Sequence, residues 1–252
     1  MNLKIVTVAT KRDGYLKYLE ESCIRNSTEL IILGMESVWT SYFDKYEILY
    51  QNLNQFDPND ILCLVDAYDV IMIDNAEKLK NKFIDFVSIH GRKIIMAHET
   101  FDDVKINGSN IPIVCDVFSF LLNTTFSDFK GVNPGTTLGF VSDIKIMIEQ
   151  LRKYKDTIND DQIIVNKYIK EYPDVIHDDI NREFFSLSYE ILDLPEFDNI
   201  SGFFIHRPGN LPFGEFLRNN GYDITTKEEV DILQTGISKI VGKSQYYIKM
   251  IR

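Results

Sequence analysis

Short, continuously apolar runs alternate with stretches of helical periodicity along the first part of the chain. The apolar runs fall at residues 3–9, 30–33, 61–65 and 93–97. Between them, apolar side chains recur every three to four positions around residues 15–23, 46–53 and 76–90, a spacing typical of amphipathic helices. Strands that alternate with helices form βαβ units. The pattern therefore predicts an α/β fold with a mostly parallel central sheet flanked by helices.

The second part of the chain is less regular. We expect mixed strands and loops over residues 99–133, then a turn at 133–135 leading into a strand that ends near residue 140. Ser142 is a candidate N-cap for a helix running toward residue 154, and Asn159 or Asp160 for another ending near residue 171. A last apolar strand is expected at 202–205. No repeat or linker divides the chain, so we predict one domain over residues 1–252.

Composition narrows the classes of partner. The chain has 252 residues, 44% of them hydrophobic, and a net charge of −11, which argues against nucleic acid or an anionic membrane as partner. An acidic surface would also repel a diphosphate unless a divalent cation reversed the local charge. Signal-peptide and membrane-spanning patterns are absent, so we expect a cytoplasmic protein. The cysteines, in apolar contexts, are expected to be buried free thiols: Cys23, Cys63 and Cys115.

Two carboxylates follow the most apolar strand. The segment Ile61-Leu62-Cys63-Leu64-Val65 leads directly into Asp66-Ala67-Tyr68-Asp69. Open α/β sheets bind ligands at the carboxyl ends of their strands, and carboxylate oxygens suit Mg²⁺ or Mn²⁺. The alternative is a solvated turn in which Asp66 caps the next element.

Other candidates have simpler explanations beside the functional one. His206 ends the strand near 203–205 and would complete an Asp-Asp-His site for Mn²⁺, although a strand-end histidine is usually a structural hydrogen-bonding group. Asp160 and Asp161 open a helix, where acidic residues ordinarily complement the helix dipole. Gly135 would let backbone approach a ligand, or would simply serve a turn. Trp39 would pack in the core, form a lid, or stack on a sugar or base.

Taken in order, these segments resemble a known family: the glycosyltransferase domain of procollagen lysyl hydroxylases and the related procollagen galactosyltransferases. The resemblance spans residues 3 to 210. It is carried by Val8-Ala9-Thr10, Leu33-Gly34 with Trp39, Lys45, Asp66-Ala67-Tyr68-Asp69, residues 133–140, Asp160-Asp161-Gln162 and His206.

This resemblance implies a GT-A type fold and a UDP-sugar donor, UDP-glucose or UDP-galactose, with Mn²⁺ or another divalent cation. Residues 1–100 would form the nucleotide-sugar-binding half, and residues 101–252 the acceptor-side half and C-terminal tail. Asp66, Asp69 and His206 are the implied metal ligands, and Asp161 and Asp160 the implied catalytic residues. The implied donor-site residues are Val8, Thr10, Trp39, Lys45, Tyr68, Asn133, Gly135 and Asn210.

One departure from the family follows the histidine at position 206. The family's His-Gly-Asn-Gly-Pro is replaced here by His206-Arg207-Pro208-Gly209-Asn210, which changes the place of the asparagine. From the resemblance as a whole we predict a hexosyltransferase that acts on an acceptor hydroxyl of a glycan or protein, such as a collagen-like hydroxylysine or its galactose. An inactive nucleotide-sugar-binding protein and a metal-dependent nucleotidyltransferase or phosphohydrolase are the alternatives.

Overall fold

A computed structural model describes residues 1–99, 131–158, 160–187, 200–209 and 212–234, together with two short strands. These strands, β6 (Lys105–Ile106) and β7 (Ser109–Asn110), form a hairpin. Cys115, Asn159 and Asn210 lie outside the described residues. Within the described part of the chain, no helix is both long and apolar enough to cross a lipid bilayer.

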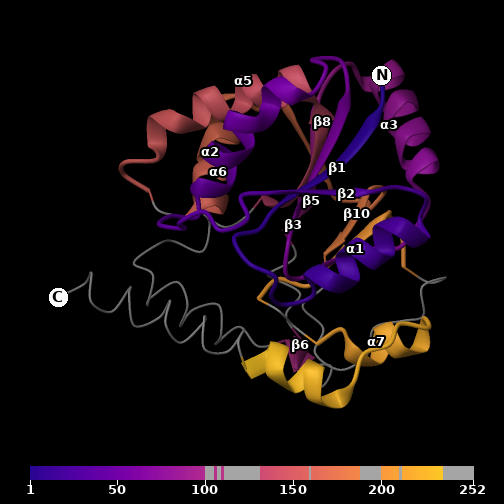
Figure 1. Cartoon of the computed structure of the whole chain (residues 1–252). Coiled ribbons are helices and arrows are strands. Elements are labelled where there is room, and N and C mark those ends of the chain that lie inside the picture. Colours follow the sequence, from indigo (N-terminus) through magenta and orange to yellow (C-terminus); the bar gives the residue numbers. More distant parts are fainter. Residues whose placement is uncertain are drawn as a thin grey trace.

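The centre of the molecule is a six-stranded sheet (Figure 1). Its strands are β1 (Leu3–Val8), β2 (Leu30–Leu33), β3 (Ile61–Asp66), β5 (Ile94–His98), β8 (Val132–Phe140) and β9 (Ile176–Asp179), in the spatial order β2-β1-β3-β8-β5-β9. All neighbours are parallel except β8, which runs antiparallel to both β3 and β5. The predicted α/β class and mostly parallel sheet are confirmed.

Helices cover both faces of this sheet. One face packs against α2 (Asp44–Asn52), α5 (Val141–Leu151) and α6 (Asp161–Glu171), and the other against α1 (Leu16–Arg25) and α3 (Ala76–His90). The strand residues alternate accordingly: in β3, Leu62 and Leu64 join the α2 side, whereas Cys63 and Val65 join the α1 side. Burial on both faces explains why the strands are continuously apolar. Two 3₁₀ turns, η1 (Leu53–Gln55) and η4 (Arg152–Tyr154), follow α2 and α5.

A smaller sheet lies at the carboxyl edge of the large one. It consists of β10 (Phe185–Leu187), β11 (Phe204–His206) and β4 (Val70–Met72), with β11 in the middle, parallel to β10 and antiparallel to β4. Helix α7 (Gly214–Asn219) packs beside it through a third apolar cluster that includes Tyr15, Tyr18, Ile205 and Phe213. The short turn between β3, in the large sheet, and β4, in the small sheet, connects the two sheets along the chain.

Two local predictions were wrong. Residues 133–135 belong to β8 and do not form a separate turn before it. Asn133 pairs with Ala97 of β5, and Pro134 and Gly135 lie where the register of this pairing shifts. Ser142 is not an N-cap, since α5 begins at Val141 and the Ser142 hydroxyl accepts a hydrogen bond from Arg92. The predicted burial of Cys23 and Cys63 as free thiols is confirmed.

Candidate active site

Asp66, Asp69 and His206 converge where the two sheets meet. Asp66 ends β3, Asp69 precedes β4, and His206 ends β11 opposite Val70 of β4. One potential ligand atom from each of the three side chains lies within 4.8 Å of the other two. His206 Nε2 is 3.4 Å from Asp69 Oδ1 and 3.9 Å from Asp66 Oδ2. The structure thus brings together residues 137 to 140 positions apart in the sequence, and all three can present a metal ligand.

The His206 ring is buried beside the two carboxylates. Its side chain is 2% exposed, and neither ring nitrogen makes a hydrogen bond to any residue that the structure describes. Burial disfavours the charged form of the ring, but the carboxylates of Asp69 and Asp66 outweigh it and raise the pKa of His206 above its ordinary value. Leaving buried polar atoms without partners costs about 1–3 kcal/mol, and a cation bound between the imidazole and the two carboxylates would reduce that cost.

Gly135 leaves the space that this group needs. It lies in β8 beside the end of β3, and its backbone NH donates a hydrogen bond to Asn133 Oδ1 at 2.9 Å. A Cβ atom at this position would lie 2.3 Å from His206 Cε1 and 2.7 Å from Asp66 Oδ2. Glycine is therefore required here by close packing against the side chains of the two candidate metal ligands.

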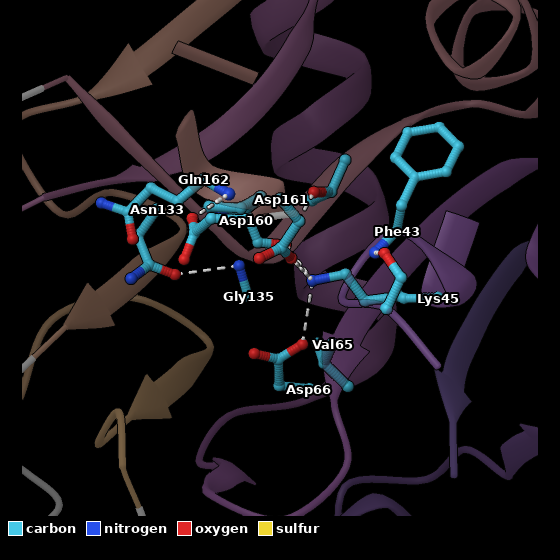
Figure 2. Close-up of polar contacts among 12 residues, drawn as sticks. Phe43, Lys45, Val65, Asp66, Asn133, Gly135, Asp160, Asp161 and Gln162 are labelled. Carbon is cyan, nitrogen blue, oxygen red and sulfur yellow. Dashed lines mark hydrogen bonds and ion pairs between the residues drawn. The ribbon is translucent and has the colours of Figure 1, made fainter. Parts of the chain in front are cut away.

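Lys45 links one candidate metal ligand to one candidate catalytic residue. It lies in the first turn of α2, and its buried Nζ is 2.6 Å from Asp161 Oδ2 and 3.2 Å from Asp66 Oδ1 (Figure 2). The Nζ also donates to the backbone carbonyl of Pro134 at 3.4 Å. Burial alone would lower the pKa of Lys45, but the two carboxylates raise it well above its ordinary value. The lysine therefore carries a fixed positive charge beside the Asp-Asp-His group.

The two aspartates at the start of α6 have different surroundings. Asp160 is the N-cap, and its Oδ1 accepts hydrogen bonds from the backbone NH groups of Gln162 and Ile163 at 3.0 and 3.2 Å. Asp161 instead points toward Lys45 (Figure 2). The helix-start explanation holds for Asp160, whereas Asp161 faces the candidate metal group.

The remaining predicted donor-site residues lie along the same edge of the sheet. Val8 ends β1, and the backbone NH of Thr10 donates to Tyr68 Oη at 3.2 Å. Tyr68 Oη in turn donates to the backbone carbonyl of Lys11 at 3.1 Å. Trp39 lies between β2 and α2 and is 40% exposed, so it is not a core residue.

Sequence reasoning gave no role to a second polar group at this edge. Glu99 Oε2 accepts from Asn133 Nδ2 at 3.0 Å and from Gln162 Nε2 at 2.7 Å. His98 Nδ1 lies 2.9 Å from both carboxylate oxygens of Asp178. Both His98 and Glu99 directly follow the buried positions of β5, just as Asp66 follows those of β3. That shared signal, a polar residue at the end of an apolar strand, would have found them.

Comparison with known proteins identifies the family. The sequence model of the PLOD GT domain, the glycosyltransferase domain of procollagen lysyl hydroxylases, matches residues 1–186. The match covers most of the chain, so the protein is a glycosyltransferase. It belongs to the PLOD GT domain family, as the sequence motifs predicted. No curated protein sequence matches the chain significantly.

Two solved structures are similar to the chain at low identity. One is a glycosyltransferase involved in the glycosylation of the major capsid of PBCV-1, with 16% identity and a TM-score of 0.49 over 83% of this chain and 94% of that one. The other is A197 from STIV, with 14% identity and a TM-score of 0.34 over 57% of this chain and 68% of that one. At these values neither similarity informs the activity or the substrate.

Proposed function

We propose that this glycosyltransferase is metal-dependent and transfers a hexose, glucose or galactose, from a UDP-sugar to an acceptor hydroxyl. Membership of the family supports glycosyl transfer. The observation that carries the finer proposal is the convergence of Asp66, Asp69 and His206 around a buried imidazole.

These three residues fit a divalent cation of borderline character. Two carboxylates and one imidazole suit Mn²⁺ better than Ca²⁺, which prefers oxygen ligands alone. Gly135 packs directly against two of them, so a larger residue at this position would displace the candidate ligands. A cation held there would occupy the partnerless side of His206 and would lower the repulsion between the two carboxylates.

The chain's own residues would then bind and orient the donor. A bound cation supplies neutralisation of the charge that develops on the departing UDP. Lys45 adds a second positive charge 3.2 Å from Asp66, while Val8, Thr10 and Tyr68 would line the uridine pocket and Trp39 the diphosphate-sugar. Asn133 and Gly135 would shape the floor of the site, and we assign Asn210 to the donor site as the counterpart of the family's asparagine, which stands two positions nearer the histidine.

Asp161 would act on the sugar or the acceptor. It would serve as the general base on the acceptor hydroxyl or would stabilise positive charge developing on the sugar ring, depending on whether the reaction inverts or retains the anomeric configuration. Asp160 would support it as the helix cap. A collagen-like hydroxylysine or its galactose is the proposed acceptor class, and the proposed location is the cytoplasm.

A donor panel tests this proposal. Purified protein is incubated with UDP-glucose, UDP-galactose and UDP-N-acetylglucosamine, each with Mn²⁺ and with EDTA, and released UDP is measured. We expect release from a UDP-hexose that requires Mn²⁺ and rises when hydroxylysine is added. UDP binding without release would favour the inactive binding protein, and release of UMP would favour a phosphohydrolase or nucleotidyltransferase.

A further inference from the structure

His98 and Asp178 occupy the same edge and the same face of the large sheet as Asp66. His98 shares its face of β5 with Ile94 and Met96, which pack in the apolar cluster on the α2 and α6 side. Asp66 shares its face of β3 with Leu62 and Leu64 of that cluster. Asp178 pairs with Met96 across the β5–β9 ladder and lies on this face too. The polar ends of β3, β5 and β9 therefore lie along one line.

The strand order places the proposed uridine pocket, the candidate metal group and His98 in the sequence in which uridine, diphosphate-sugar and acceptor would have to bind. The proposed uridine residue Val8 is on β1, Asp66 is on the neighbouring β3, and His98 is on β5 with only β8 in between (Figure 1). Two strand spacings of about 4.7–4.9 Å put the ends of β3 and β5 roughly 9–10 Å apart. The glycine at position 135 keeps β8 clear beside Asp66. His98 is thus on the side of the metal group away from the uridine pocket.

The contacts of His98 fix which nitrogen is available. Nδ1 is 2.9 Å from both oxygens of Asp178, while Nε2 makes no hydrogen bond to any described residue and the side chain is 34% exposed. A carboxylate at Nδ1 holds that nitrogen as the proton-bearing one, leaves Nε2 as a proton acceptor and stabilises the imidazolium that forms. Glu99, the next residue, is held by Asn133 and Gln162, so the end of β5 is fixed against the site.

We propose that His98, oriented by Asp178, is the group that removes the proton from the acceptor hydroxyl. This inference rests on the proposed function. In the step, the acceptor oxygen forms a bond to the anomeric carbon of the hexose as the bond from that carbon to the UDP oxygen breaks. The electron pair of the broken bond leaves with UDP, and the hydroxyl proton moves to His98 Nε2. Asp161, already paired with Lys45, is left to stabilise the charge on the sugar.

Substitution with chemical rescue tests this assignment. UDP release from UDP-glucose and UDP-galactose is measured with Mn²⁺, using water and free hydroxylysine as acceptors, and the dissociation constant of UDP is measured in parallel. We expect His98→Ala to lower kcat about 10²–10⁴-fold, the usual contribution of a general base, with unchanged UDP affinity. Added imidazole should restore part of the lost rate, and Asp178→Asn should lower kcat less than His98→Ala does.

His177→Ala is the matched control. His177 is adjacent to Asp178 in the same strand, but its ring packs on Phe86 and His90 near α3, on the other face of the sheet. This variant should keep the wild-type rate. A His98→Ala enzyme within about twofold of wild type, or one whose loss is not restored at all by imidazole, overturns the inference. Failure of the wild-type protein to release UDP from any donor would instead overturn the proposed function.

Discussion

Two buried regions that share strands β4 and β11 satisfy their polar groups in opposite ways. In the aromatic cluster beside α7, two buried tyrosine hydroxyls have partners: Tyr15 Oη accepts from the backbone NH of Phe213 at 3.0 Å, and Tyr18 Oη donates to the carbonyl of Asp223 at 3.2 Å. In the Asp-Asp-His group, the two ring nitrogens of His206 have no hydrogen-bond partner among the described residues. The regions are separated by the thickness of one small sheet.

The difference shows which region is built for stability. A satisfied buried hydroxyl contributes to folding, whereas a buried ring nitrogen without a partner costs free energy. The aromatic cluster should therefore tolerate no loss of hydrogen bonding without loss of stability. The Asp-Asp-His group should tolerate substitution in the fold but not in the reaction. The following predictions test that contrast.

The largest expected effect is on catalysis at Asp66. Asp66→Ala should lower Mn²⁺-dependent UDP release by at least about 10²–10³-fold, because charge on the departing UDP loses its stabilisation. The melting temperature measured without metal should change little, since the buried Lys45 loses its contact with Asp66 but keeps its ion pair with Asp161. A stable variant with the wild-type rate would contradict the metal assignment.

Asp161 and Asp160 offer a matched pair. Asp161→Asn removes the charge facing Lys45 and should lower kcat about 10²-fold, the effect expected when a reacting group is misplaced. Asp160→Asn should leave kcat and stability nearly unchanged, because asparagine is as good an N-cap as aspartate. Steady-state kinetics at saturating UDP-sugar and Mn²⁺ measure both. If both variants keep the wild-type kcat, neither aspartate is catalytic.

Gly135 links packing to metal binding. In Gly135→Ala, the new methyl group meets His206 and Asp66, so Mn²⁺ affinity should fall about 10–100-fold, as when the surroundings of metal ligands are disturbed. Gly139→Ala in the same strand is the control, since the atoms nearest to its Cβ would belong to the apolar side chains of Ile94 and Ile144, at 3.2 Å and beyond. Calorimetric titration of Mn²⁺ compares them. Equal Mn²⁺ affinities in the two variants would show that Gly135 does not affect metal binding.

Tyr15→Phe should show the opposite behaviour. Removing the hydroxyl leaves the buried NH of Phe213 without its acceptor, so unfolding free energy should fall by about 1–3 kcal/mol. UDP release per folded molecule should not change. Denaturant unfolding and the UDP assay, performed on the same preparation, measure both quantities. A loss of rate without a loss of stability would contradict the structural role assigned to the aromatic cluster.

The smallest expected effect is at a surface ion pair outside both regions. Hydrogen bonding to Arg152 lowers the pKa of Glu47, although partial burial opposes it. A lowered pKa means that the stabilisation is present above the unfolded-state value, about 4.3 for glutamate, and is lost as the pH falls through the folded-state value. Glu47→Gln should lose less than about 1 kcal/mol at pH 7 and nothing near pH 2. A constant difference across this pH range would exclude the ion pair as its cause.

Local patterns predicted most of the large sheet and its helices. Runs such as 61–65 are apolar because both faces of the sheet are covered, and strand, helix and Asp160 cap positions followed from nearest neighbours in sequence. The small sheet could not be predicted in this way, because β4 and β11 pair across more than 130 residues. Proline and glycine at positions 134 and 135 predicted a turn, but both residues belong to β8, the antiparallel strand between β3 and β5.

In the candidate site, too, local patterns predicted single residues but not the contacts that depend on how distant elements pack. Asp66 and His206 could be selected individually because each follows an apolar strand. The contact between Lys45 and Asp161 depends on how α2 and α6 pack on one face, and no pattern along the chain encodes that. The His98–Asp178 pair depends on β9 lying beside β5, which only the sheet order reveals.

The position of the Asp-Asp-His group between two sheets has a mechanical consequence. Asp66 ends a strand of the large sheet and His206 ends a strand of the small one, so a cation held by both would crosslink the sheets. Ligation to the native state alone stabilises it by mass action, about 2.7 kcal/mol at a metal concentration one hundred times Kd. The stiffness of this joint and the capacity to bind donor would therefore rise and fall together as Mn²⁺ is supplied or withdrawn.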